Sequence, residues 1–177
     1  MDINFILTQV FGIIALVFVC IAYFMKNRSN FLVLQIISSI FYSGAFLFQD
    51  LLVAGFGTII SLLRTISIYL FVKAKKEPPF TYLSLIFAAY FINASIFSQT
   101  LFDLIALSAD CIFAVALVTA NLKATHYMMV FANILQIIYN IFNLCYTNAM
   151  LDLIETIVGI ISVIMFEIAL KKKKTGF

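Results

Sequence analysis

Five polar side chains recur along one apolar stretch near the C-terminal end of the sequence. They are Asn133, Gln136, Asn140, Asn143 and Thr147, separated by three, four, three and four residues. In an α-helix this spacing places all five on one face. Amides that faced lipid would have no hydrogen-bond partners. The stripe therefore predicts a helix face turned toward other helices or water, where amides can bond the polar groups of a small solute.

Three ionisable residues lie inside other apolar stretches: Arg64 and Asp110 near the middle of theirs, and Glu155 in the outer third. Such residues are costly in lipid and normally face a bundle interior or a wet cavity. Their depths allow the arginine side chain to reach the aspartate. Two interpretations stay open: a buried ion pair that fixes helix packing, and a site for a substrate or proton. They are compatible if a solute competes for one partner.

Further polar residues recur on neighbouring stretches and are expected to face the same interior. Tyr42 and Tyr139 occupy similar places in their stretches and could stack on a ligand, although aromatic packing is the simpler interpretation. His126 is expected at the inner interface, as a solvated side chain by default and as a gate or proton relay in the sharper alternative. The remaining members are Gln35, Ser39, Asp103, Asp152, Gly159 and Ser162.

The elements that must position these residues are membrane-spanning helices. Of 177 residues, 64% are hydrophobic and 11% are charged, whereas soluble domains carry about 25% charged residues. A spanning helix needs about 20 apolar residues, and seven stretches qualify, within one transmembrane domain over 1–177. They are Phe5–Met25, Phe31–Phe48, Leu51–Val72, Phe80–Phe97, Leu101–Leu122, His126–Tyr146 and Ala149–Leu170.

The basic residues predict how this all-α bundle is oriented. Arg64 apart, the Lys and Arg residues fall after the first, third, fifth and seventh stretches, and the opposite connections contain none. Cytoplasmic loops carry the excess of Lys and Arg, so we expect the N-terminus outside and a basic cytoplasmic tail at 171–177. The residues concerned are Lys26, Arg28, Lys73, Lys75, Lys76, Lys123 and Lys171–Lys174.

A weak internal similarity predicts a repeat. The segment 11–16 is similar to 102–107, and Cys20 then matches Cys111 at the same offset. Two parallel three-helix units, 5–72 and 101–170, would be joined by a linker helix at 80–97. Parallel repeats related by an axis along the membrane normal are typical of transporters, with the site at the repeat interface.

Short motifs point to a known group. They are the stretch Ile59 to Thr65 with its buried arginine, the stretch Gln136 to Asn140, and Leu151 to Glu155. With the 3+1+3 layout, the chain resembles the SWEET and PQ-loop superfamily of small-solute transporters, and more narrowly the bacterial inner-membrane YgjV-type family. It lacks the Pro-Gln pair and has no Trp. The resemblance therefore implies a fold and a transporter class, and not sugar as the substrate.

Other functions are disfavoured by what the sequence lacks. There is no HExxH or GxSxG motif, no CxxC pair and only one His for a zinc site, so neither an enzyme, a metal site nor a cofactor is predicted. The basic residues lie in short loops, which argues against nucleic acid. We predict a small polar-solute transporter, a uniporter or proton-coupled carrier, in the bacterial inner membrane. The alternative is a non-transporting receptor or assembly subunit, and a homo-oligomer is left open. The predicted site comprises Tyr42, Arg64, Asp110, Asn133, Gln136, Tyr139, Asn140 and Glu155.

Overall fold

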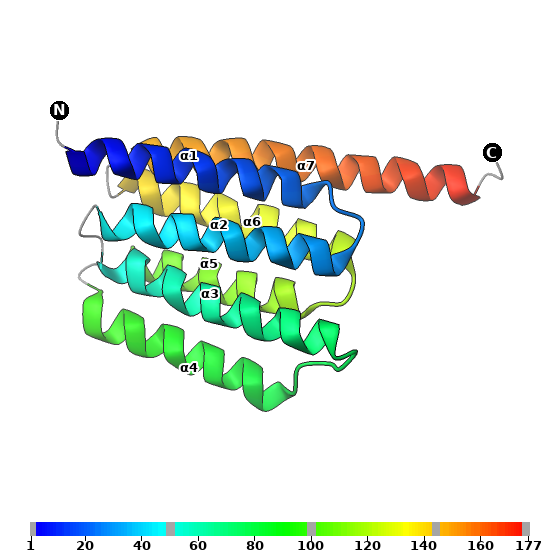
Figure 1. Cartoon of the computed structure of the whole chain (residues 1–177), viewed down its shortest axis with the longest axis horizontal. Helices are drawn as coiled ribbons and strands as arrows, with labels where there is room; N and C mark the ends of the chain where they lie inside the picture. The colour runs from blue at the N-terminus through cyan, green and yellow to red at the C-terminus, as the bar shows by residue number, and fades with distance from the viewer. Residues whose placement is uncertain (1–2, 49–51, 99–101, 143–145, 175–177) are drawn as a thin grey trace.

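The computed structural model describes residues 3–48, 52–98, 102–142 and 146–174, and these contain seven α-helices (Figure 1). The prediction of an all-α chain with seven helices is thereby confirmed for the described residues. Five helices are long and apolar enough to cross a membrane: α1, α2, α3, α4 and α7. Of the other two, α5 has only 16 residues and α6 carries the polar stripe. The helices are α1 (Ile3–Tyr23), α2 (Arg28–Leu47), α3 (Leu52–Lys73), α4 (Phe80–Phe97), α5 (Asp103–Val118), α6 (Leu122–Phe142) and α7 (Tyr146–Lys174).

Helix ends differ from the predicted spans where an asparagine caps a helix. The helix α2 begins three residues earlier than predicted because the Asn27 side chain accepts a hydrogen bond from the Ser29 amide at 2.9 Å. Such a side-chain acceptor satisfies one of the free amides of a first turn. Similarly, Asn121 accepts from the Lys123 amide at 3.0 Å, and α6 begins before His126. The predicted continuation of α5 to Leu122 is wrong, because Thr119 is already extended.

The largest difference concerns the last helix. Tyr146, predicted as the end of one span, begins α7 instead, and α7 continues to Lys174. Three predicted positions lie outside the described residues. They are the helix starts at Leu51 and Leu101 and the polar-stripe residue Asn143. The linker prediction at 80–97 coincides with α4.

The helices pack as two layers that meet at both edges (Figure 1). In one layer α1 packs on α2 and α2 on α3; in the other, α5 packs on α6 and α6 on α7. At one edge α1 contacts α7, and at the other α3 contacts α5. The helix α4 lies outside this second edge and packs on both α3 and α5. This arrangement leaves an interior between the layers.

Two glycines allow close approaches between helices. A Cβ atom at Gly44 of α2 would lie 2.7 Å from the ring of Phe11 on α1. A Cβ atom at Gly159 of α7 would lie 2.7 Å from Val130 on α6 and 3.2 Å from Tyr23. Small residues let helix backbones approach closely within membranes. The pairs α1–α2 and α6–α7 are therefore tightly packed.

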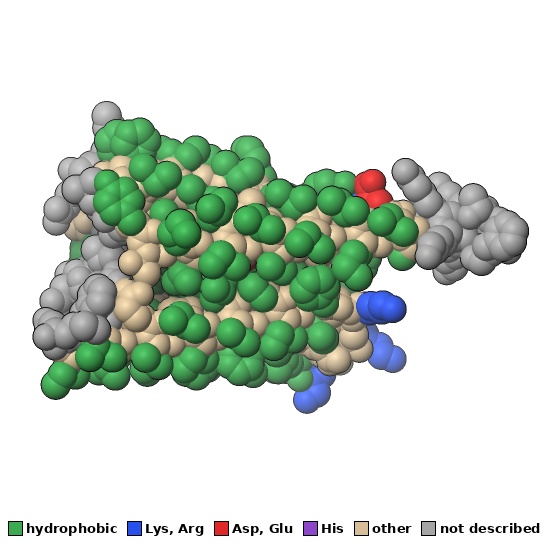
Figure 2. All heavy atoms as spheres, turned by 90° about the horizontal axis from the view of Figure 1, so that it is seen from above, with side chains coloured by type: hydrophobic (Ala, Val, Ile, Leu, Met, Phe, Trp, Pro, Cys, Tyr) green, Lys and Arg blue, Asp and Glu red, His purple; other side chains and the backbone are tan. Residues whose placement is uncertain are grey.

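The outer surface suits a bilayer. Large apolar side chains are exposed on every helix, among them Ile13, Leu63, Leu85 and Phe131. Figure 2 shows hydrophobic side chains over most of the face in view, with Lys and Arg gathered toward one end. The α1–α2, α3–α4 and α5–α6 connections lie together at that end, and α7 projects beyond it (Figure 1). We call it the lysine-bearing end.

An apolar layer fills the bundle near the lysine-bearing end. Its buried side chains come from the C-terminal parts of α1, α3 and α5 and from the N-terminal parts of α2 and α6. Burial of such side chains away from water and lipid favours close packing of all five helices there. The apolar layer comprises Val19, Ala22, Tyr23, Phe31, Leu32, Ile68, Ala116, Leu117 and Met129.

Candidate functional site

A cavity of about 160 Å³ lies between the two layers and is lined by side chains from all seven helices. One water molecule needs about 10–15 Å³ of such space, so the cavity can hold a small solute. Val19, Leu117 and Met129 of the apolar layer form one boundary. All eight residues of the predicted site line this one cavity: Tyr42, Arg64, Asp110, Asn133, Gln136, Tyr139, Asn140 and Glu155.

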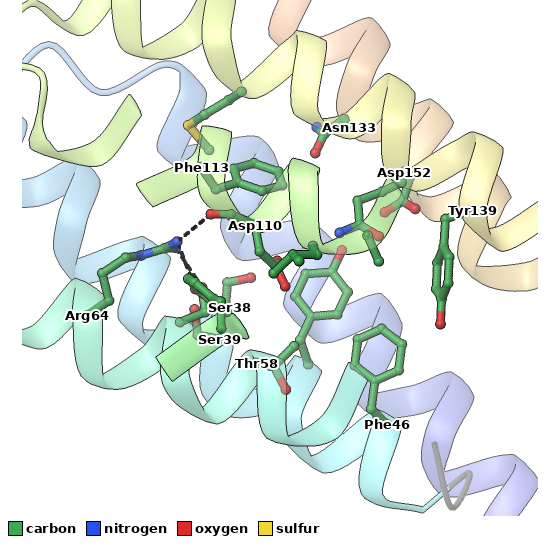
Figure 3. Close-up of a pocket in the computed structure, with 18 of the residues that line it drawn as sticks. Ser38, Ser39, Phe46, Thr58, Arg64, Asp110, Phe113, Asn133, Tyr139 and Asp152 are labelled. Atoms are coloured by element: carbon green, nitrogen blue, oxygen red, sulfur yellow. Dashed lines mark hydrogen bonds between the residues drawn. The ribbon is translucent and has the colours of Figure 1, made fainter. Parts of the chain in front are cut away.

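Arg64 is held by neutral groups. Its Nη1 donates to the Tyr90 hydroxyl at 2.9 Å and its Nη2 to the Ser61 hydroxyl at 2.6 Å. Toward Asp110 it reaches the main-chain oxygen, at 3.4 Å (Figure 3). The two side chains are close enough to interact, but they form no ion pair within 4.0 Å, so the buried-pair interpretation does not describe this geometry.

The Asp110 carboxyl group lies against the glycine of a neighbouring helix. A Cβ atom at Gly57 of α3 would be 3.4 Å from Asp110 Oδ2. No Lys, Arg or His side chain of the described residues lies within 4.0 Å of this carboxylate. The absence of a side chain at position 57 therefore leaves space in front of Asp110, on the cavity side.

Two further carboxyl groups occupy successive turns of α7. Asp152 Oδ2 accepts a hydrogen bond from Asn140 Nδ2 at 2.6 Å. Glu155 Oε1 accepts from the Tyr23 hydroxyl at 3.3 Å, and this hydroxyl accepts in turn from Asn133 Nδ2 at 3.4 Å. The α6 amides thus contact the acids of α7 and the end of α1. All of these partners are neutral.

A row of polar groups on α2 has no partner at all. Gln35 Nε2, Ser38 Oγ and Tyr42 Oη are buried without a hydrogen bond, and so is Nε of Arg64. All four residues line the cavity. A buried polar group left without a partner costs about 1–3 kcal/mol. The row is therefore arranged for partners that water or a ligand would supply.

The expectation of a solvated His126 is wrong. Its side chain is fully buried and packs against the rings of Tyr23, Phe31 and Phe166 at 5.1–5.5 Å. Its Nδ1 lies 3.1 Å from the Ser162 hydroxyl, which donates to the main-chain oxygen of Tyr23. Since this hydroxyl has one proton, Nδ1 is the donor to Ser162. His126 therefore joins α6, α7 and α1 beside the apolar layer.

Sequence reasoning missed several cavity-lining residues, among them Ser38, Tyr90 and Asn93. Tyr90 and Asn93 of α4 are buried against the cavity, although the linker helix was expected only to restore chain direction. A signal existed, since these two polar residues lie three apart in the largely apolar middle of the segment. Tyr23 supports the lining from behind, because its hydroxyl bonds Glu155 and Asn133. It gave no such signal, since tyrosine near a helix end is ordinary at a membrane interface.

Comparison with known proteins now gives the family. The chain matches the family described as bacterial inner membrane protein, Imp-YgjV, over residues 6–169. The protein belongs to this family. No curated protein and no solved structure matches it. Membership in Imp-YgjV confirms the predicted location in the bacterial inner membrane. It lends no support to the wider SWEET and PQ-loop relationship, and it carries no statement about transport.

Proposed function

We propose that this Imp-YgjV protein transports a small polar solute, which binds in the cavity between the two layers. The observation that carries the proposal is the cavity itself. It is lined by all seven helices and combines unpartnered donors on α2 with carboxyl groups on α5 and α7. A packed receptor or assembly subunit would gain stability by pairing or removing these groups. A solute site needs them free.

The packing of the helices supports two related units. Exchange of α1, α2 and α3 for α5, α6 and α7 turns the contacts α1–α2, α2–α3 and α1–α7 into α5–α6, α6–α7 and α5–α3. All of these contacts are present. Such a relationship is expected of a 3+1+3 repeat, with α4 as the linker. Repeats of this kind place the substrate at their interface.

The lining residues of α2 and α6 support the same relationship. Ser38 and Tyr42 follow Gln35 by three and seven residues. On α6 the polar lining residues Asn133, Gln136 and Asn140 have the same spacing. A shift of 98 residues relates the two sets, and the same shift relates Thr58 to Thr156. The two helices thus present equivalent polar faces to the cavity.

Transport also requires that the cavity open to one side at a time. At the lysine-bearing end it is bounded by the apolar layer. The closest glycine contacts, 2.7 Å at Gly44 and at Gly159, lie within a unit. The glycine contacts between units, Gly12 to Leu151 and Gly159 to Tyr23, are looser at 3.1 and 3.2 Å. The proposal is that each unit moves as a body against the other. By the distribution of Lys and Arg, we place the lysine-bearing end in the cytoplasm and the N-terminus outside.

The experiment tests whether water reaches the cavity from each side. Native cysteines are replaced, and Ser38→Cys is introduced at the unpartnered serine of the cavity. Its matched control is Ser108→Cys, at an exposed serine of α5 that faces away from the cavity. Each variant is exposed to a small membrane-impermeant methanethiosulfonate reagent from either face of oriented vesicles.

The transporter proposal expects the cysteine at position 38 to be modified from both faces, and that at position 108 from neither. Modification at position 38 from neither face would contradict the proposal. The packed receptor or assembly role would then be preferred.

A further inference from the structure

Hydrogen-bond donors and carboxyl groups lie on different sides of the cavity. On one side are the donors without acceptors, from α2 and α3: Gln35, Ser38, Tyr42 and Nε of Arg64. On the other side are two acids of α7. Figure 3 shows Ser38 and Arg64 on one side of the cavity and Asp152 on the other, with Asp110 between them. A ligand that satisfies both sides must therefore have two different ends.

The donor side suits a carboxylate. Gln35 Nε2 and Arg64 Nε are donors only, and the hydroxyl groups of Ser38 and Tyr42 can donate. A carboxylate offers two oxygens with about four acceptor positions, whereas a carbonyl or hydroxyl oxygen offers about half as many. Ser38 and Arg64 are almost wholly buried, with 1% and 3% of their surfaces exposed. Their free groups therefore cannot turn to bulk water for a partner.

The acid side suits an ammonium group. Asp152 and Glu155 have only neutral donors, and no Lys, Arg or His side chain of the described residues lies within 4.0 Å of either carboxylate. The charge of Asp110 is partly offset by the neighbouring Arg64 guanidinium. Nothing comparable lies beside the α7 acids. In the part of the chain that is described, no group of three His, Cys, Asp or Glu side chains could hold a metal ion, so an organic cation fits better.

We propose that the solute is a small amino-carboxylic acid, with its carboxylate against Gln35, Ser38 and Arg64 and its ammonium group against Asp152 and Glu155. This inference rests on the proposed function and specifies its substrate class. The single orientation follows from the charges, because Arg64 is the one cation among the described residues that lines the cavity. A dicarboxylate would place like charge beside the four acids that line the cavity, Asp103, Asp110, Asp152 and Glu155, which costs several kcal/mol. A diamine would leave the α2 donors without acceptors.

The test uses the purified full-length protein in lipid nanodiscs and equilibrium binding by calorimetry. The probes are glycine, 3-aminopropanoate, 4-aminobutanoate and 5-aminopentanoate, each compared with the diamine and the dicarboxylate of equal carbon number. We expect at least one amino acid to bind about tenfold more tightly than both of its matched compounds. Stronger binding of the diamine or the dicarboxylate, or equal binding of all three, would overturn the inference.

Two variants identify the ends of the ligand. The first ratio compares the affinity for the best amino acid with that for the same compound without its amine. Asp152→Asn should lower this ratio about tenfold. The second ratio compares the affinity for the same amino acid with that for the compound without its carboxylate. Ser38→Ala should lower this second ratio instead. The control, Ser108→Ala, should change neither ratio. Equal losses in both ratios from either variant would indicate a general disturbance of the fold and contradict the assigned orientation.

Failure of this inference is distinguishable from failure of the proposed function. If Ser38→Cys is modified from both faces but no amino acid is preferred, the cavity is a transport site for another solute. If that cysteine is modified from neither face, both proposals fail.

Discussion

The side chain of Arg28 donates a hydrogen bond to the main-chain oxygen of Leu117 at 2.8 Å, and a second to that of Val118 at 3.1 Å. It thus joins the first turn of α2 to the last turn of α5, 89 residues away. The last carbonyl groups of a helix lack partners within the helix, and a cation there also complements the helix dipole. In the proposed two-unit arrangement α2 and α5 belong to different units, and we propose that this contact holds the lysine-bearing end closed.

Replacement of Arg28 by Ala should therefore open that end. Hydrogen bonds to a charged group are worth about 1.5–3 kcal/mol, so we expect Ser38→Cys to be modified about tenfold faster from the lysine-bearing side. The measurement is the rate of thiol modification in oriented vesicles. Lys26→Ala is the control, since Lys26 is an exposed residue of the same connection. Equal rates in the two variants would show that Arg28 does not hold the bundle closed.

Two glycine substitutions should separate packing from binding. In Gly44→Ala the new Cβ would meet the Phe11 ring, which Phe41 and Phe48 confine at 5.6 Å on two sides. Overpacking of this kind costs about 1–3 kcal/mol and should lower the apparent unfolding temperature in detergent.

Gly57→Ala is the matched substitution. There the Cβ would make only ordinary contacts, at 3.4 Å from Asp110 Oδ2, so we expect the unfolding temperature to be kept and solute binding to be weakened. A lower unfolding temperature for Gly57→Ala than for Gly44→Ala would contradict this assignment.

The buried hydroxyl of Tyr23, which bonds the cavity-lining residue Glu155, should contribute to stability. Tyr23→Phe removes the donor to Glu155 and the acceptor for Asn133, which we expect to cost about 1–3 kcal/mol because both groups are buried. The comparison is Tyr127→Phe, which removes a hydroxyl bonded to Glu167 at an exposed site. Thermal unfolding of both variants checks this. A loss from Tyr127→Phe as large as that from Tyr23→Phe would contradict it.

The ion pair at the lysine-bearing end should matter little. Lys123 Nζ lies 2.8 Å from Glu167 Oε1, and the two side chains are 31% and 42% exposed. Exposed pairs contribute about 0–1 kcal/mol. Lys123→Ala should therefore leave the unfolding temperature almost unchanged, within about 0.5 kcal/mol. A large decrease would mean that this pair is part of the closed end.

The proposed orientation has its own test. Fusion of a green fluorescent protein after Phe177 should give fluorescent cells, and fusion of alkaline phosphatase at the same point should give no phosphatase activity. The physical reason is the excess of Lys and Arg at that end, which is retained in the cytoplasm. Active phosphatase would reverse the orientation and also the side from which Arg28→Ala is expected to open the cavity.

The lining of the cavity was largely predictable, whereas its contacts were not. Helical spacing decides which residues share a face, and polar side chains in lipid must turn inward. This places Asn133, Gln136 and Asn140 correctly without any knowledge of the neighbours. The same reasoning gives only the depth of Arg64 and Asp110. Whether the side chain or the main chain of Asp110 faces the guanidinium depends on how α5 is turned about its axis. The spacing of residues in the sequence does not determine that angle.

Contacts between distant segments show the same limit. The Arg28 to Leu117 bond and the Tyr23 to Glu155 bond join residues 89 and 132 apart in sequence. Arg28 was interpreted as a loop charge because its helix was expected to begin at Phe31. The capping asparagines at positions 27 and 121 were available signals for both early helix starts, but the predicted spans begin at Phe31 and at His126.

The lengths of two helices have a consequence for the surrounding lipid. At about 1.5 Å per residue, the 16 residues of α5 span roughly 24 Å, less than the ~30 Å of a typical hydrocarbon core. The 29 residues of α7 span roughly 44 Å on the same scale. Acyl chains beside α5 must shorten or tilt to meet it. The bilayer should therefore be thinnest beside the helix that carries Asp110, and acyl-chain length should influence how easily this protein changes shape.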